Sequence, residues 1–220
     1  MNASHRNASL TALGAALLFA SVAPAAADPL RHLDYRVSLR GEGAPRSGTV
    51  HLDLIATRGE GAVVVDVAEE IRDADAGAVR VDINRSGGIA TLGAQVLSHS
   101  ELALLGILAL ESENMNGVDV GDQWQRRTSI PGGRCSSTFK VTRNDGRGHV
   151  GIAVTRTLDF SGSEHSSWRG NVEYDTNAFV PISIAFNGTV RAHPVSVNLR
   201  LVTDTFADRT GIGRHEAAER

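Results

Sequence analysis

The residues best suited to chemistry in this sequence are two polar side chains on one predicted strand. His51 and Asp53 lie two positions apart, so both point to the same face of an extended chain. Imidazole and carboxylate groups are ligands for Zn²⁺ and similar ions, but this pair supplies at most two of the ligands that a site needs. The pair indicates either a metal site completed from elsewhere in the chain or a strand face covered by water. We favour the solvated face and predict no metal.

An acidic segment further along the chain is a second candidate for ion binding. It contains Glu69, Glu70, Asp73 and Asp75. The ligand spacing of a calcium loop is absent, so a hydrated turn explains the segment better than Ca²⁺ binding. The motifs of nucleophilic hydrolases, phosphate-binding loops and zinc peptidases are absent as well. The sequence therefore predicts a protein that is not an enzyme and that has no cofactor.

Arg156 is the charged residue that fits its surroundings least. It interrupts the apolar side of a strand predicted over residues 150–160. A guanidinium on an apolar face needs a carboxylate or carbonyl partner within the protein, or an anionic head group from outside. The alternative is that Arg156 lies at a sheet edge, where its long side chain reaches water.

Aromatic and cysteine side chains are scarce. Trp124 and Trp168 are the only tryptophans, and Phe, Trp and Tyr make up 5% of the chain. Exposed rings bind sugars and single-stranded nucleic acid, so their scarcity argues against both functions. Each tryptophan is either a core residue or part of a shelf for a ligand. Cys135 is the only cysteine, which excludes an internal disulfide and leaves a buried thiol or a link to another chain.

Most of the chain must form the β-strands that position these side chains. Apolar residues alternate with polar ones in the period of two that is typical of strands with one buried face. The pattern predicts strands at residues 33–39, 50–56, 63–67, 79–83, 122–128, 139–141, 150–160, 168–174, 180–192 and 195–201. Asn187-Gly188 is typical of a hairpin turn, but a turn there would pair buried positions with solvated ones. We therefore predict one continuous strand that ends in a turn at His193-Pro194.

One segment breaks this pattern and predicts a helix. Residues 98–111 are rich in Leu and Ala, which favour helices over strands. Ser98 and Glu101 have the spacing of a capping box, in which each side chain bonds to the backbone amide of the other residue. The core of the segment, Leu102 to Leu110, contains no polar residue. A helix that is apolar on every side must be enclosed.

These elements predict a mainly β fold, with one curved antiparallel sheet or incomplete β-barrel of about nine to eleven strands and one buried helix. A sheet with one apolar face must curl or split, because a flat sheet of this size leaves that face and its edges exposed. A sheet that curls around the helix covers both the apolar face and the apolar helix. A sandwich with the helix at one end is the alternative.

The two ends of the chain predict an exported protein of one domain. Residues 1–27 resemble a cleavable signal peptide, with an apolar run too short to span a bilayer and then three alanines. Residues 28–206 then form a single β-rich domain, and residues 207–220 form a disordered polar tail. No cysteine follows the cleavage point to carry a lipid, and no other stretch is apolar enough to span a membrane. We therefore expect a periplasmic or secreted protein.

The charge balance argues against two classes of partner. Of 22 basic residues only Arg6 lies before residue 28, so 21 basic residues remain against 25 acidic ones. This balance provides no electrostatic surface for nucleic acid or for an anionic membrane. We therefore predict neither of them as a partner.

The C-terminal half carries a resemblance to a known group of proteins. The segment from Gly170 to Asp175, with the sequence GNVEYD, is followed by Val180-Pro181 and describes a strand, a turn and a strand. In a chain with one apolar helix, this segment resembles the bacterial periplasmic half-barrel families, which include the lipoprotein carrier and receptor proteins of the outer-membrane sorting pathway. The resemblance covers the domain in outline and matches no catalytic or binding residue. It implies a concave apolar cavity that shields acyl chains, with helices as plug or lid.

The leading functional hypothesis is an exported, non-enzymatic protein that binds a lipid or another apolar ligand between the sheet and the helix. The same residues could instead form a dry core. In that case the protein is an envelope structural or assembly protein that binds a protein partner through a sheet edge or through Cys135. The candidate cavity residues are Leu102, Leu105, Ile107, Leu108, Trp124, Arg156, Trp168, Tyr174 and Phe186.

Overall fold

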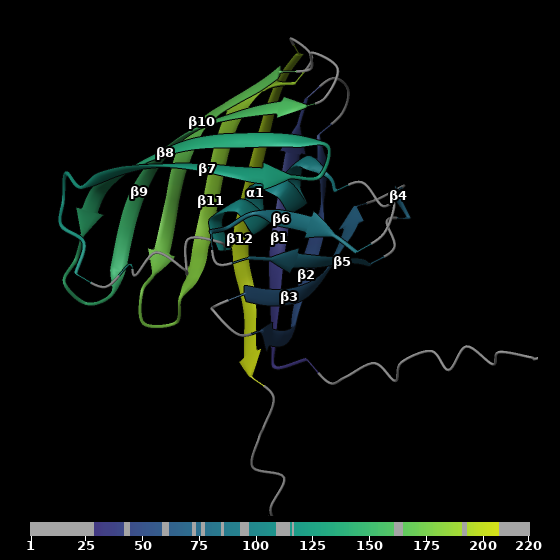
Figure 1. Ribbon diagram of the computed structural model, residues 1–220, viewed down its shortest axis with the longest axis horizontal. Coiled ribbons are helices and arrows are strands. Elements are labelled where there is room, and N and C mark those ends of the chain that lie inside the picture. The colour runs from purple at the N-terminus through teal and green to yellow at the C-terminus, as the bar shows by residue number, and fades with distance from the viewer. Residues whose placement is uncertain are drawn as a thin grey trace, which may run out of the picture.

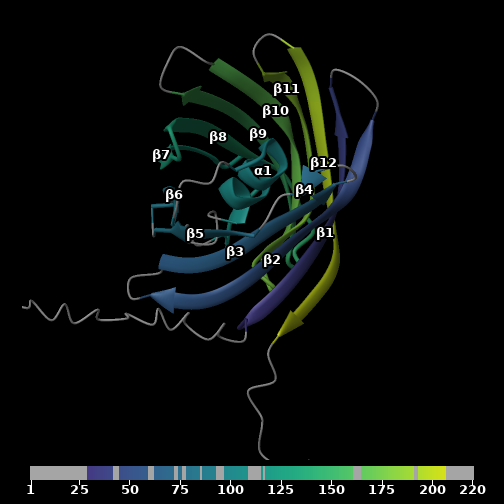
Figure 2. The same ribbon diagram turned by 90° about the vertical axis from the view of Figure 1, so that its right-hand side faces the viewer.

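The chain folds into one antiparallel β-sheet that curves into a nearly closed barrel, with a helix inside it (Figures 1 and 2). The computed structural model describes residues 29–41, 45–58, 62–71, 74–75, 78–84, 86–92, 97–108, 115, 117–160, 165–190 and 193–206. The predicted signal peptide, residues 1–27, and the predicted polar tail, residues 207–220, lie outside these ranges.

The sheet consists of two meanders, one formed before the helix in the chain and one formed after it. The first contains β1 Arg31–Arg40, β2 Arg46–Arg58, β3 Ala62–Ile71, β4 Ala74–Asp75, β5 Val79–Ile83 and β6 Ile89–Thr91. The second contains β7 Gln123–Ile130, β8 Gly133–Asn144, β9 His149–Phe160, β10 His165–Asp175, β11 Val180–Val190 and β12 His193–Phe206. The helix α1, His99–Leu108, connects them in sequence.

The two meanders are joined through their first and last strands. The order around the sheet is β6-β5-β3-β2-β1-β12-β11-β10-β9-β8-β7, and β4 pairs with β3 beside this path. The end strands β6 and β7 lie side by side, so the sheet nearly closes on itself (Figure 2). The predicted fold class is therefore confirmed: the described residues form a mainly β, barrel-like antiparallel sheet around a single helix. The sandwich alternative is wrong.

The alternation of side chains decides which face of the sheet is inside. On β10, Trp168, Val172 and Tyr174 are buried, whereas Arg169 and Asn171 between them are exposed. The buried rows of the other long strands join the same core cluster, which also contains α1. The period of two in the sequence therefore corresponds to an apolar inner wall and a polar outer wall.

The strand β11 continues through Asn187-Gly188, as predicted. Gly188 lies opposite Trp168 on β10, and a Cβ at this glycine would come within 2.9 Å of the indole ring. A missing side chain in this strand therefore makes room for a close approach. The predicted turn at His193-Pro194 is wrong, because both residues belong to β12 and His193 pairs with Val190. Proline is compatible with the first residues of a strand, so this dipeptide did not mark the turn.

The helix begins with the predicted capping box. The backbone amide of Ser98 donates a hydrogen bond to Glu101 Oε2 at 2.7 Å, and the amide of Glu101 donates to Ser98 Oγ at 3.1 Å. The apolar residues of α1 with no exposed surface are Leu104, Leu105 and Ile107. The helix packs against β3, β11 and β12, so the prediction of an enclosed helix is confirmed. Its predicted continuation to residue 111 lies outside the described residues.

The acidic segment is not the hydrated turn that the sequence predicted. Glu69 and Glu70 belong to β3, which extends beyond the predicted end at residue 67. Glu69 is buried because it faces the helix, where the hydroxyl of Ser100 donates a hydrogen bond to its carboxylate. Asp73 lies outside the described residues.

Among the helices of the described ranges, none has the length and apolar content needed to cross a bilayer.

Candidate functional site

The candidate site lies inside the barrel at the seam where β6 and β7 approach each other. Arg126 on β7 crosses this seam, because its Nε donates a hydrogen bond to the carbonyl oxygen of Ser86 at 2.9 Å. Gly87, the next residue, has a φ of 76° and its Cβ position lies 2.3 Å from Cζ of Arg126. Any side chain at position 87 would therefore strain the backbone and overlap the guanidinium. Arg126 itself is 8% exposed.

A second arginine, Arg156, lies in the middle of the inner wall. It is on β9, between β8 and β10, and is 3% exposed. Its Nε donates to Ser137 Oγ at 3.2 Å, and its Nη1 donates to the carbonyl oxygen of Leu102 on α1 at 3.3 Å. Its Cζ lies 5.5 Å from the centre of the Phe186 ring, within the range of a cation–π contact. The alternative that Arg156 reaches water at a sheet edge is wrong.

Arg156 has no carboxylate partner among the described residues, because its hydrogen-bond acceptors are a hydroxyl and a backbone carbonyl. Burial lowers the pKa of its guanidinium, and the nearby thiol of Cys135 opposes this change. Arginine nevertheless remains protonated in proteins. A positive charge without a counter-charge is therefore held in a low-dielectric interior, where an anion would interact with it strongly.

The helix makes room for this charge with a glycine. A Cβ at Gly106 would lie 2.6 Å from Nη2 of Arg156, which is closer than real contacts allow. The guanidinium therefore rests directly against the backbone of α1. This contact with Arg156 explains why a glycine, Gly106, stands among the larger apolar residues of the helix.

A small cavity lies between α1 and strands β6, β7, β8 and β9. Its apolar lining is Ile89, Leu102, Ile130 and Leu158, and its polar lining includes Arg126, Thr128, Cys135, Ser137 and Arg156. Its volume is about 10 Å³, which is close to the space that one water molecule needs. The cavity therefore combines two guanidinium groups with an apolar wall, and in this conformation it holds nothing larger than water.

No model of a known protein family matches this chain. Curated proteins give no significant match either. The cavity, the two buried arginines and the side chains around them are therefore the observations from which a function is inferred.

The structure brings some of the predicted cavity residues to this site. Leu102 and Arg156 line the cavity, and Phe186 lies beside the Arg156 guanidinium. Three other predicted residues belong to the core and not to the cavity lining: Leu105, Ile107 and Tyr174. Leu108 is partly buried and packs against the same core.

Both tryptophans pack against other rings and do not line the cavity. Trp124 is partly buried and stacks on Phe139, with 5.3 Å between ring centroids. Trp168 is 4% exposed, and its ring centroid lies 5.8 Å from that of His99 at the start of α1. Trp168 therefore lies where it can report a movement of the helix.

Two groups of this site were missed in the sequence. Arg126 shares the inner face of β7 with Trp124, Thr128 and Ile130, so the period of two could have identified it as it identified Arg156. Ser137 lies on the inner face of β8 and has no such signal, because a small residue fits either face. Cys135 lies on the same face and is buried, with its sulfur 3.4 Å from Ser137 Oγ, so the predicted buried thiol is confirmed and is not available to another chain.

Proposed function

We propose that this protein is an exported, non-enzymatic binding protein for an amphipathic molecule with an anionic head group, of which a long-chain fatty acid is the simplest example. The observation that carries the proposal is the guanidinium of Arg156, which is buried without a carboxylate partner among the described residues and faces a cavity. The head group would accept hydrogen bonds from Arg156 and Arg126. The apolar wall and the helix would cover the chain. The resemblance to periplasmic half-barrel carriers supports the same class of ligand.

The small volume of the cavity sets a condition on this proposal. A space of about 10 Å³ does not admit an acyl chain, so α1 must move away from β7, β8 and β9 when the ligand binds. The helix also packs against β3, β11 and β12, so this movement requires those contacts to rearrange as well. Protein cavities for ligands of this size normally measure several hundred Å³. Binding should therefore change the environment of Trp168 beside the helix.

Displacement of a fluorescent fatty acid by palmitate and by hexadecanol tests the head-group assignment. The two competitors have chains of the same length, so their difference in affinity measures the contribution of the carboxylate. Hydrogen bonds to charged groups are worth about 1.5–3 kcal/mol, so wild type should bind palmitate about 10- to 100-fold more tightly. Arg156→Gln should abolish that preference. Arg127→Gln, which removes an exposed guanidinium from the outer face of β7, is the matched control and should preserve it.

Two further measurements test the cavity itself. Native mass spectrometry before and after solvent extraction should reveal a co-purified lipid. In Trp124→Phe protein the remaining tryptophan is Trp168, whose fluorescence should change when palmitate is added. The proposal is overturned if the protein carries no lipid and does not bind the fluorescent fatty acid. Equal affinity for palmitate and hexadecanol would instead overturn the role of Arg156.

A second candidate is an envelope assembly protein with a dry core, and the small cavity volume favours it. Such a protein would bind a partner through its outer face or through the end strands β6 and β7. A disulfide to that partner is not expected, because Cys135 is buried. Cys135→Ser should therefore leave any oligomer intact. Capture of a protein partner by a chain that binds no fatty acid would favour this candidate.

A further inference from the structure

Two histidines and two aspartates form a cluster on the outer face of the barrel, on the neighbouring strands β1 and β2. In the register of these strands His32 lies opposite Asp53, and Asp34 lies opposite His51. Opposite residues in antiparallel strands place their side chains in contact. The two histidines therefore occupy one diagonal and the two aspartates the other. The sequence identified His51 and Asp53 and predicted that they are only solvated.

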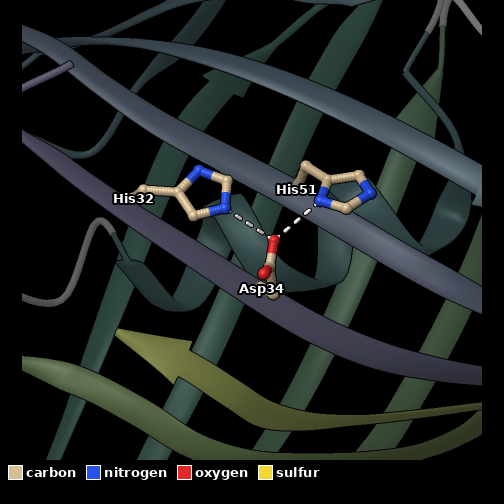
Figure 3. A group of neighbouring side chains, drawn as sticks. All are labelled: His32, Asp34 and His51. Carbon is tan, nitrogen blue, oxygen red and sulfur yellow. Dashed lines mark hydrogen bonds and ion pairs between the residues drawn. The ribbon is translucent and has the colours of Figure 1, made fainter. Parts of the chain in front are cut away.

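Both imidazole rings direct one nitrogen at the same carboxylate oxygen (Figure 3). His32 Nε2 lies 2.8 Å from Asp34 Oδ1, and His51 Nδ1 lies 2.7 Å from the same atom. The ligand atoms of these three residues lie within 4.8 Å of one another. Two imidazole nitrogens and one carboxylate oxygen at this separation match the ligand types and the number of protein ligands of many zinc sites that keep one position for water.

The other nitrogen of each imidazole faces an outer carboxylate. His32 Nδ1 lies 2.6 Å from Asp53 Oδ1, and His51 Nε2 lies 3.5 Å from Glu70 Oε2 on β3. Metal-binding histidines usually donate their second N–H to such a carboxylate, which fixes the tautomer and strengthens the ligand. A solvated strand face does not require this arrangement. Asp53 and Glu70 thus act as positioning residues for the two imidazoles.

We infer that His32, Asp34 and His51 form a binding site for a divalent transition-metal ion of the Zn²⁺ class on the outer face of β1 and β2. The imidazole nitrogens exclude hard cations such as Mg²⁺ and Ca²⁺, which prefer oxygen ligands. Side-chain exposures of 34% for His32, 22% for Asp34 and 32% for His51 leave the site open to an ion from solvent. The site lies on the opposite side of the sheet from α1, so it is independent of the interior cavity.

Titration of the full chain with Zn²⁺, in protein prepared without a polyhistidine tag, tests this site. Competition with a chromophoric chelator gives the affinity and the number of ions bound. Wild type should bind one Zn²⁺ at this site, and excess Mg²⁺ should not compete. His32→Gln and His51→Gln should each weaken binding by more than 100-fold. Asp53→Asn should retain the stoichiometry but weaken binding by about 10- to 100-fold, as expected for a positioning residue.

The matched control is His165→Gln. His165, at the start of β10, also lies on the outer face of the sheet, and its Nδ1 is 2.7 Å from Asp159 Oδ1, but the described residues place no second imidazole beside it. This substitution should leave Zn²⁺ affinity unchanged. Thermal unfolding with EDTA verifies that each variant is folded. The inference is overturned if wild type binds no Zn²⁺, or if His32→Gln and His51→Gln bind it as tightly as wild type.

Discussion

The guanidinium of Arg156 rests on the backbone of α1 at Gly106, where a Cβ would lie only 2.6 Å from Nη2. The position of the helix inside the barrel and the burial of this charge are therefore linked. A glycine in a helix interior is normally unfavourable by about 1 kcal/mol relative to alanine. Its presence in α1 is explained by the space that the guanidinium needs.

Gly106→Ala should therefore destabilise the protein, although alanine is the better helix former. Overpacking of a filled interior costs about 1–3 kcal/mol, which exceeds the gain in helix propensity. Urea unfolding measures the change. In an Arg156→Met background the clashing atoms Nη1, Nη2 and Cζ are absent, so the same alanine should be neutral or stabilising. A Gly106→Ala effect that is identical in both backgrounds would show that the two residues are not coupled.

Arg156→Met should stabilise the ligand-free protein. Methionine has a similar apolar stem, and it removes a charge that is buried without a carboxylate partner among the described residues. Replacement of buried charged groups by apolar residues of similar volume is often neutral or stabilising by about 1–4 kcal/mol. We expect a gain in the free energy of unfolding together with a loss of preference for palmitate. A clear loss of stability would mean that the hydrogen bonds to Ser137 and Leu102 outweigh the cost of burying the charge.

The ion pair between Arg31 and Asp204 should stabilise the pairing of the first strand, β1, with the last strand, β12. Arg31 donates from Nε and Nη2 to the two oxygens of Asp204, at 2.8 and 2.7 Å, and from Nη1 to the carbonyl oxygen of Ala178. Because Arg31 is 8% exposed, its bonds are shielded from water. Asp204→Asn should lower the free energy of unfolding by about 1.5–3 kcal/mol.

The exposed pair of Arg80 and Asp66 is the control for this effect. This pair is also bidentate: Nε and Nη2 of Arg80 donate to the two carboxylate oxygens of Asp66, at 2.7 and 2.6 Å. However, 42% of the Arg80 side chain is exposed. Exposed ion pairs contribute little because water competes for both partners. Asp66→Asn should therefore change the midpoint of urea unfolding much less than Asp204→Asn. Equal shifts would show that burial of the pair at the β1–β12 junction is unimportant.

Local features of the sequence predicted most of the fold. The alternation around Trp168 and Tyr174 and the capping box at Ser98 and Glu101 each depend on residues within a few positions of one another. Such signals are set by the geometry of a strand or a helix end, so one sequence is enough to identify them. The apolar helix then required a sheet that curves around it.

Long-range register was not predictable in the same way. The sequence identified His51 and Asp53, but only the pairing of β1 with β2 places His32 and Asp34 beside them. A shift of this pairing by one residue would send the side chains to opposite faces. The volume of the cavity beside α1 could not be predicted from the sequence either, because it depends on how side chains from distant strands, such as Arg156, fill the interior.

Glu101 should make stability depend on pH in a direction opposite to that of a typical salt-bridged carboxylate. It is 2% exposed, its Oε1 has no hydrogen-bond partner among the described residues, and burial together with the nearby Glu69 raises its pKa. The folded protein therefore holds a proton on this group more tightly than the unfolded chain does. Its contribution to stability is present below the ordinary pKa of 4.5 and is lost as the pH rises through the raised value.

Glu101→Gln tests this directly, because glutamine accepts the same hydrogen bond from the amide of Ser98 without a charge. The variant should be more stable than wild type at pH 7, and the difference should shrink as the pH falls toward 4, where the wild-type carboxyl is also neutral. Urea unfolding of both proteins at several pH values measures this difference. Arg127→Gln is the control, because this exposed residue of β7 does not contact the helix cap and arginine stays charged over this range, so its effect should be the same at every pH. A Glu101→Gln difference that is constant across this range would show that folding does not raise the pKa of Glu101.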